Sequence, residues 1–142
     1  MTIDAVFGQP LPEVTVAVGD VELRPFAMSD LALIEEASAD PFIPLITTVP
    51  AVYTPAEGAA FIERQAHRSA AGEGWSLAIV DPEADRAVGQ IGLWISHLRH
   101  GRAEIGYWVA ASGRGSGMAG AATKALTEWA FEHLDVDRLT LF

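Results

Sequence analysis

The sequence has no cysteine, only one lysine and no long apolar run. The absence of cysteine excludes disulfide bonds, thiolate zinc sites and a cysteine nucleophile. No apolar stretch reaches the roughly 18 residues that a membrane-spanning helix needs, so we expect no membrane partner. The first basic residue is Arg24, and no positively charged leader precedes an apolar stretch. We therefore expect a cytoplasmic location.

Positive charge is scarce as well. Nine lysine and arginine residues stand against 19 aspartate and glutamate residues, which gives a net charge of −10 and an isoelectric point near 4.6. This balance argues against nucleic acid as a partner, because that interaction needs a basic face. It is compatible with an amine-bearing partner. Half of the 142 residues are hydrophobic, which is enough for one domain with a buried core.

The patterning divides the chain into an N-terminal arm, residues 1–13, and one domain, residues 14–142. Two alternating segments around Gly19-Asp20 predict a β-hairpin. Thr54, Pro55 and Glu57 form the signature of a helix start. The other elements are expected as follows: a helix capped by Ser29 and ending near Ser38, a proline-rich loop over 40–52, strands over 75–80, 87–96 and 103–110, a helix ending near Leu134, and a strand from Arg138.

The resulting order, β-β-α-α-β-β-β-α-β, predicts an α+β fold with flanking helices. Its sheet is mixed and mostly antiparallel, with one parallel pair across the last helix. The sequence ends at Phe142, a few residues into the last strand. We expect the domain to be incomplete at its C-terminus. We also expect a homodimer or strand exchange to cover the open strand.

The most informative segment follows the strand over 103–110. It is a glycine-rich turn, Ser112–Gly117, which opens a long helix. Such a turn exposes several backbone N–H groups, and the helix start adds the positive end of its dipole. The segment therefore predicts a phosphate or pyrophosphate site. Arg114 at its edge is placed for a charge-assisted contact with the anion.

Two other phosphate-binding motifs fit less well. A Walker-type loop needs a lysine directly after its glycine, whereas Lys124 lies two turns into the helix. The spacing of Gly115, Gly117 and Gly120 matches a dinucleotide fingerprint, but that motif belongs in a repeated parallel βαβ unit. A dinucleotide-binding fragment stays open as an alternative. His97 and His100 flank a turn without nearby carboxylates, so we expect solvated loop residues and no metal site.

The segment from Glu104 to Ala119 resembles motif A of the GNAT (general-control-related) N-acetyltransferases. Its core, Arg114-Gly115-Ser116-Gly117-Met118-Ala119, satisfies the family signature Arg/Gln-x-x-Gly-x-Gly/Ala. Residues 21–26 and 125–131 are also similar to the branch that acetylates ribosomal-protein N-termini. The resemblance covers about residues 21–142 and implies the GNAT acyl-CoA N-acyltransferase fold without its C-terminal third.

The resemblance implies acetyl-CoA as cosubstrate. It implies that backbone amides of residues 114–119 hold the pyrophosphate: Arg114, Gly115, Ser116, Gly117, Met118 and Ala119. The backbone of Trp108, Val109 and Ala110 would then pair with the pantetheine arm and the acetyl carbonyl. Glu104 matches the position of a general base that deprotonates the acceptor amine.

The implied reaction is direct acetyl transfer to a primary amine of a peptide or protein N-terminus or of a small molecule. The alternative is a GNAT-like module that binds CoA or a partner chain without catalysis. In the family, the last third often supplies a Tyr or Ser near the thiol sulfur. Because the matching positions stop before that region, we expect these residues alone to lack the catalytic acid.

Overall fold

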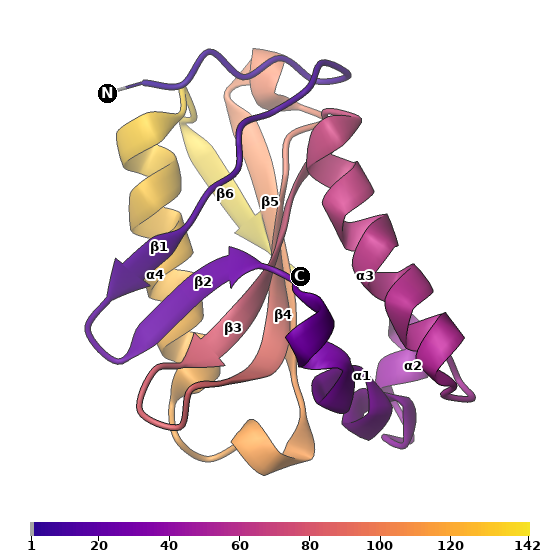
Figure 1. Ribbon diagram of the computed structural model, residues 1–142. Helices are drawn as coiled ribbons and strands as arrows, with labels where there is room; N and C mark the ends of the chain where they lie inside the picture. Colours follow the sequence, from indigo (N-terminus) through magenta and orange to yellow (C-terminus); the bar gives the residue numbers. More distant parts are fainter. Residues whose placement is uncertain (1) are drawn as a thin grey trace.

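The computed structural model describes residues 2–142 and contains a six-stranded sheet in the spatial order β1-β2-β3-β4-β5-β6 (Figure 1). The strands are β1 (Val16–Val18), β2 (Val21–Pro25), β3 (Gly74–Asp81), β4 (Arg86–Trp94), β5 (Arg102–Val109) and β6 (Arg138–Leu141). Each strand pairs antiparallel with the next, except that β5 and β6 are parallel. The predicted α+β class with one parallel pair is confirmed.

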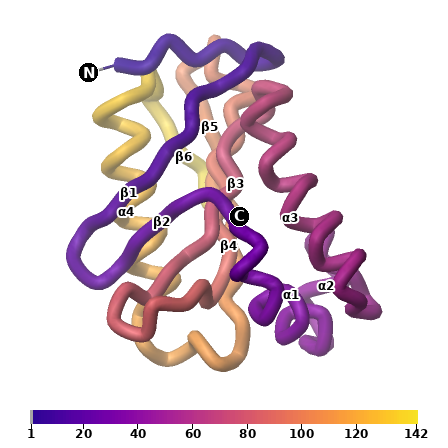
Figure 2. Tube along the Cα trace, viewed as in Figure 1, coloured from indigo at the N-terminus to yellow at the C-terminus, as the bar shows by residue number. Residues whose placement is uncertain are grey.

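Helices cover both faces of the sheet (Figures 1 and 2). One face carries α1 (Leu31–Ser38), α2 (Ile43–Ile46) and α3 (Pro55–Ala70), and the other carries α4 (Met118–His133). Short 3-10 turns are η1 (Met28–Asp30), η2 (Leu98–His100) and η3 (Ala111–Gly113). Alternating strand residues feed two separate hydrophobic clusters: Ile105 packs on the α4 side, whereas Trp108 packs on the α1 and α3 side.

The predicted start of α3 is confirmed in its capping geometry. Thr54 Oγ1 accepts a hydrogen bond from the Glu57 N–H at 3.1 Å, and Pro55 occupies the first helical position. The side-chain oxygen satisfies one of the donors that a helix start leaves unpaired. The local sequence therefore fixes where this helix begins.

Two local predictions were wrong. Ser29 does not cap α1; the capping position belongs to Asp30, whose Oδ2 accepts the Ala27 N–H at 2.8 Å. The expected loop over 40–52 contains the one-turn helix α2. Asp40 Oδ1 accepts the N–H groups of Phe42 and Ile43 at 2.8 and 3.1 Å, which stabilises this turn despite the prolines.

Asp30 also anchors the sheet to α1. Its two carboxylate oxygens each accept a hydrogen bond from Arg24 of β2 at 2.8 Å. The Asp30 side chain is 3% exposed. Donation of these hydrogen bonds to the Asp30 carboxylate raises the pKa of Arg24 above its ordinary value. The pair thus joins β2 to the first helix through a bidentate, charge-assisted contact.

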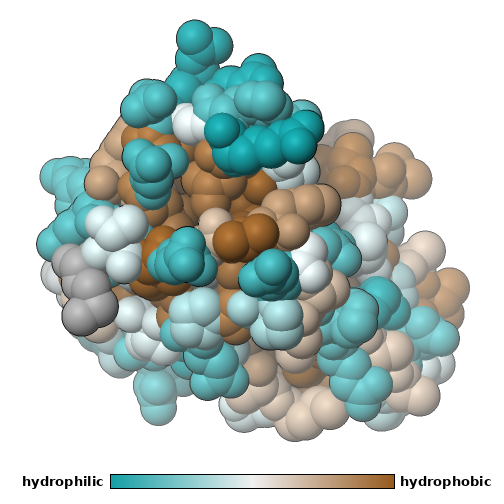
Figure 3. Space-filling view, turned by 90° about the horizontal axis from the view of Figure 1, so that it is seen from above, coloured by the Kyte–Doolittle hydropathy of each residue, from teal (hydrophilic) through white to brown (hydrophobic). Residues whose placement is uncertain are grey.

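The N-terminal arm, residues 2–13, crosses one end of the sheet between α4 and α3 (Figure 1). The Ile3 N–H donates to the His133 carbonyl at 2.6 Å, and the Leu11 N–H donates to the Ser69 carbonyl at 2.9 Å. The Trp75 indole N–H donates to the Pro12 carbonyl at 2.8 Å. The view onto this end shows an apolar hollow with a hydrophilic rim (Figure 3). The arm and η2 line a cavity of about 830 Å³ here.

Along residues 2–142, none of the helices combines the length and apolarity that crossing a bilayer would require.

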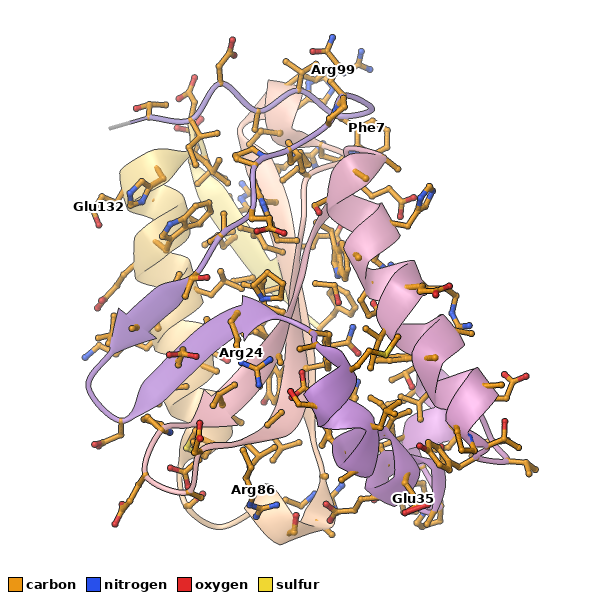
Figure 4. All side chains as sticks on the ribbon, viewed as in Figure 1. Phe7, Arg24, Glu35, Arg86, Arg99 and Glu132 are labelled. Atoms are coloured by element: carbon orange, nitrogen blue, oxygen red, sulfur yellow. The ribbon has the colours of Figure 1, made fainter. Side chains whose placement is uncertain are left out.

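We expect Asp30→Ala to lower the free energy of unfolding by about 2–3 kcal/mol, because it leaves the Arg24 guanidinium and the Ala27 N–H without their shared acceptor. Urea denaturation followed by circular dichroism measures the change. Glu132→Ala, at an exposed position of α4 (Figure 4), is the control and should stay within about 0.5 kcal/mol of the unchanged protein. An Asp30→Ala value as small as the control would contradict the anchoring role.

Candidate functional site

The glycine turn, residues 114–117, connects η3 to α4. Gly115 and Gly117 adopt left-handed backbone conformations, with φ of +84° and +76°. A side chain other than glycine is strained in this region, which accounts for both glycines. A Cβ built at either position, or at Gly120 in the first turn of α4, would meet no atom within 4 Å. The surface over the turn is therefore open.

This turn presents unused backbone donors. Within residues 2–142, no acceptor is hydrogen-bonded to the N–H groups of Gly115, Ser116, Gly117, Met118, Ala119 and Gly120. Gly117, the N-cap residue, supplies no side-chain cap to α4. Several convergent N–H groups at the positive end of a 16-residue helix suit a phosphate-type anion.

The Arg114 side chain holds the turn against neighbouring elements and does not extend toward the turn's free N–H groups. Its Nε–H donates to the Val109 carbonyl at 3.0 Å, and its Nη2 donates to Asp40 Oδ2 at 3.0 Å. Its backbone N–H is also used, by the Ala111 carbonyl at 3.3 Å. The sequence analysis placed this side chain for a charged contact with an anion. In the structure it does not make that contact. The guanidinium instead connects the turn to β5 and to the α1–α2 connection.

A second contact holds η3 against α1. Glu36 accepts hydrogen bonds from the Ser112 N–H at 2.8 Å and from the Ser112 hydroxyl at 2.6 Å. Arg86 of β4 donates to the Ser112 carbonyl at 3.2 Å, and Figure 4 shows it beside η3. Glu35, the neighbouring residue of α1, is exposed, whereas Glu36 is half-buried by this contact.

The two edges of β5 are paired to different extents. Its register with β4 runs from the Trp94–Glu104 pair to the Gly89–Val109 pair. Its register with β6 ends at Ile105, whose carbonyl accepts the Phe142 N–H at 3.0 Å. In the part of the chain that the structure describes, residues 106–109 have no strand on the β6 side. The second half of β5 thus borders a gap.

Backbone direction alternates along β5. The Ala110 N–H donates to the Val88 carbonyl on the β4 side, whereas the Ile105 carbonyl faces β6. By this alternation the N–H groups of Tyr107 and Val109 face the gap, and Trp108 pairs with Gln90 of β4. The sequence analysis expected backbone contacts from Trp108, Val109 and Ala110, and of these Val109 directs its N–H into the gap. The N–H of Tyr107 also faces the gap, and the sequence analysis did not predict it.

Two hollows meet at the gap and share Tyr107 and Phe142 among their lining residues. The turn-side hollow, about 530 Å³, is also lined by Gly120, Thr123 and Lys124 of α4. The aromatic pocket, about 320 Å³, lies toward α2 and α3. Its lining is Ile46, Thr47, Thr48, Arg68, Gln90, Gly92, Trp94, Gly106, Tyr107, Trp108 and Phe142.

A buried polar network orients the Trp108 ring in the wall of the aromatic pocket. The Trp108 indole N–H donates to Gln90 Oε1 at 2.6 Å. Gln90 Nε2 donates to Ser76 Oγ at 2.6 Å and to Gln65 Oε1 at 2.9 Å. Gln65 and Ser76 are 2% and 6% exposed. Because each buried polar group has a partner, the network fixes the side chains around the pocket.

Glu104 lies on the same face of β5 as Gly106 and Trp108, at the level of Trp94 on β4 and Thr140 on β6. It is half-buried and does not line the aromatic pocket. It lies opposite Trp94, which does line the pocket, so Glu104 stands at the edge of the pocket wall.

His97 and His100 flank η2, far along the chain from the glycine turn. Over residues 2–142, no group of three or more His, Cys, Asp or Glu side chains is arranged to hold a metal ion.

Comparisons with known proteins agree on one family. The model of the GNAT acetyltransferase domain matches residues 20–142, and the chain belongs to this family. The family transfers acetyl groups from acetyl-CoA. A comparison with curated proteins finds no match.

Similar solved structures include a ribosomal-protein-serine acetyltransferase-like protein from Vibrio cholerae, with 18% identity and a TM-score of 0.76 over 92% of this chain and 74% of that chain. A GNAT-family acetyltransferase from Bacillus anthracis has 16% identity and a TM-score of 0.70, over 89% and 71%. The microcin C7 self-immunity acetyltransferase MccE, solved with acetyl-CoA and AMP, has 17% identity and a TM-score of 0.68, over 87% and 69%. At these identities the likeness shows the shared fold.

The support provided by Asp40 depends on its charge. Hydrogen bonds from the N–H groups of Phe42 and Ile43, and then Arg114, hold the pKa of Asp40 below its ordinary value of 3.8. A lowered pKa in the folded state stabilises the protein above pH 4, and this contribution is lost as the pH falls through the lowered value.

We therefore expect Asp40→Asn to be less stable than the unchanged protein at pH 7, with the difference shrinking toward zero below about pH 3. Urea midpoints measured from pH 7 to pH 2.5 give the comparison. Asp20→Asn, in the exposed hairpin turn, should show no such pH dependence. A constant difference across this range would mean that the Asp40 charge does not contribute.

Proposed function

We propose that this chain is an N-acetyltransferase that moves acetyl from acetyl-CoA directly to a primary amine. The observation that carries the proposal is the line formed by the glycine turn, the turn-side hollow, the gap beside β5 and the aromatic pocket. This line offers an anion site at one end and an aromatic pocket at the other. It suits a long cosubstrate that meets a second substrate at the gap.

In this proposal the free N–H groups from Gly115 to Gly120 bind the pyrophosphate. Lys124, which the sequence left without a role, lines the adjacent hollow and adds a positive charge there. The pantetheine arm then extends along the unpaired half of β5. Its amides can pair with backbone groups of Tyr107 and Val109 much as a neighbouring strand would.

The Val109 N–H is placed to serve the chemistry at the thioester. When an amine attacks the acetyl carbonyl, negative charge develops on the carbonyl oxygen. An N–H group fixed in a strand and pointing into the gap can stabilise that charge without reorganising. Collapse of the tetrahedral intermediate breaks the C–S bond and leaves the CoA thiolate, which takes up a proton.

The acceptor amine must lose a proton before it attacks, because an alkyl ammonium has no free electron pair. Glu104 is our proposed base. Its place opposite Trp94, at the edge of the pocket, suits proton transfer either directly or through a bridging water molecule. The acceptor that we favour is a peptide or protein N-terminal amine, which the likeness to the Vibrio cholerae protein supports. A small-molecule amine uses the same chemistry.

The anion site is tested by Gly120→Glu, which places a carboxylate among the N–H donors. Gly120 has an ordinary helical backbone and open space around its Cβ, so the variant should fold. We expect acetyl-CoA affinity, measured by calorimetric titration, to fall at least about tenfold because the anion meets a like charge.

Gly120→Ala is the matched control, because it adds the Cβ without the charge and should bind acetyl-CoA as the unchanged protein does. Equal affinity for Gly120→Glu would place the cosubstrate elsewhere. Binding of acetyl-CoA without transfer to any amine would favour a non-catalytic CoA-binding module.

The proposed base is tested by Glu104→Gln, which keeps the shape of the side chain and removes its basicity. We expect kcat for acetyl transfer to fall about 100-fold at pH 7, with acetyl-CoA affinity unchanged. The loss should diminish at high pH, where the amine is already neutral. Glu128→Gln on the exposed side of α4 is the control. An unchanged kcat would remove Glu104 from the mechanism.

A further inference from the structure

The lining of the aromatic pocket has a charge that differs from that of the whole chain. The protein has a net charge of −10, yet no aspartate or glutamate lines this pocket. Arg68 of α3 is its charged lining residue. Most of the rest is aromatic or apolar. A ligand held here therefore meets one positive charge in the lining, while the Glu104 carboxylate stands at the edge, opposite Trp94.

The Arg68 guanidinium lies over an aromatic ring but is not neutralised. Its Cζ lies 4.8 Å from the centre of the Trp94 ring, the distance of a cation–π contact. Within residues 2–142, it has no carboxylate within ion-pair distance and no side-chain hydrogen bond. The stacked face leaves the N–H edge of the guanidinium available. That edge is the part that binds carboxylates in a bidentate manner.

Two paired glycines shape the adjoining wall. Gly92 of β4 lies opposite Gly106 of β5. A Cβ at Gly92 would collide with the Trp94 ring, and a Cβ at Gly106 would come within 2.8 Å of the Phe142 ring. The rings thus lie directly over bare backbone. They form a flat apolar surface beside the guanidinium.

Several other polar groups of the pocket are already occupied. The Trp108 indole N–H is donated to Gln90. The Thr47 hydroxyl donates to the Ile43 carbonyl at 2.7 Å and accepts the Val49 N–H. Thr48 Oγ1 accepts a bond from Gln65 at 3.5 Å. Arg68 is thus the charged group of the lining, and its side chain and the exposed Tyr107 hydroxyl are left for a ligand.

We propose that, among amino-acid and peptide N-terminal amines, this pocket selects those that bear a carboxylate close to the amine and an apolar body, and that Arg68 is the specificity-determining residue. The acceptor role rests on the proposed acetyltransferase function. Polycationic amines are disfavoured, because Glu104 serves the reacting amine and a second ammonium would meet Arg68 and no carboxylate of the lining. The negative net charge attracts cations to the protein as a whole, but Arg68 in the pocket wall repels them at short range.

The test compares two probes that differ only in charge, N-acetyl-L-phenylalanine and N-acetyl-L-phenylalaninamide. Both lack an ionisable amine, so amine basicity does not enter the comparison. Trp94 and Trp108 line the pocket, so tryptophan fluorescence reports binding. We expect the carboxylate probe to bind about tenfold more tightly than the amide. Spermidine should not displace it.

Arg68→Met keeps the aliphatic stem over Trp94 and should abolish the difference between the probes. Arg68→Lys should retain part of it. Arg99→Met, an exposed arginine of η2 outside this pocket (Figure 4), is the charge-matched control and should leave the tenfold difference intact.

Four results would overturn the proposal: failure of both probes to bind, equal binding of the two probes, displacement by spermidine, or a preference that survives Arg68→Met. Carboxylate preference without acetyl-CoA binding in the calorimetric titration would retain the pocket assignment and reject the acetyltransferase function. Acetyl transfer to phenylalanine and to spermidine at equal rates would retain the acetyltransferase function and reject the pocket assignment.

Discussion

The site depends on a single constraint, the pairing of β5 with β4. The bonds run along nearly the whole strand and fix the register and the backbone direction of β5. On the other edge, the described residues bond to β6 as far as Ile105. Because β4 holds the second half of β5 extended, the N–H groups on that other edge keep a fixed direction. The proposed role of Val109 depends on this arrangement.

A glycine turn gains open N–H groups at the cost of side chains that could hold it, so its neighbours must supply the support. Arg114 and Ser112 provide it by bonding to Asp40 and Glu36, which lie at and beyond the end of α1. Asp40 uses its other oxygen to stabilise α2, which contributes Ile46 to the aromatic pocket. One carboxylate thus touches both the anion-binding turn and the element that borders the pocket.

Local signals in the sequence were sufficient for the order of the strands and the longer helices and for the glycine turn, but not for α2. Thr54 and Pro55 define a helix start, and the alternation along 103–110 places Trp108 and Ile105 on opposite faces. The contacts that support the glycine turn could not be predicted from the sequence, because they join residues far apart in the chain. Glu36 and Ser112 are 76 positions apart, and nothing near either residue identifies its partner. The same limit hid the network that joins Gln65, Ser76 and Gln90 to Trp108.

Because basic residues are scarce, the two halves of the proposed site bind their ligands by different means. Several arginines are committed to the fold: Arg24 to Asp30, Arg64 to the Thr48 carbonyl, Arg86 to Ser112 and Arg114 to Asp40. An acidic chain with so few free cations cannot attract a polyphosphate through long-range field. It can hold one through backbone N–H groups, whose strength depends on contact and not on net charge. Lys124 beside the turn and Arg68 in the pocket then supply local charge where a ligand would lie.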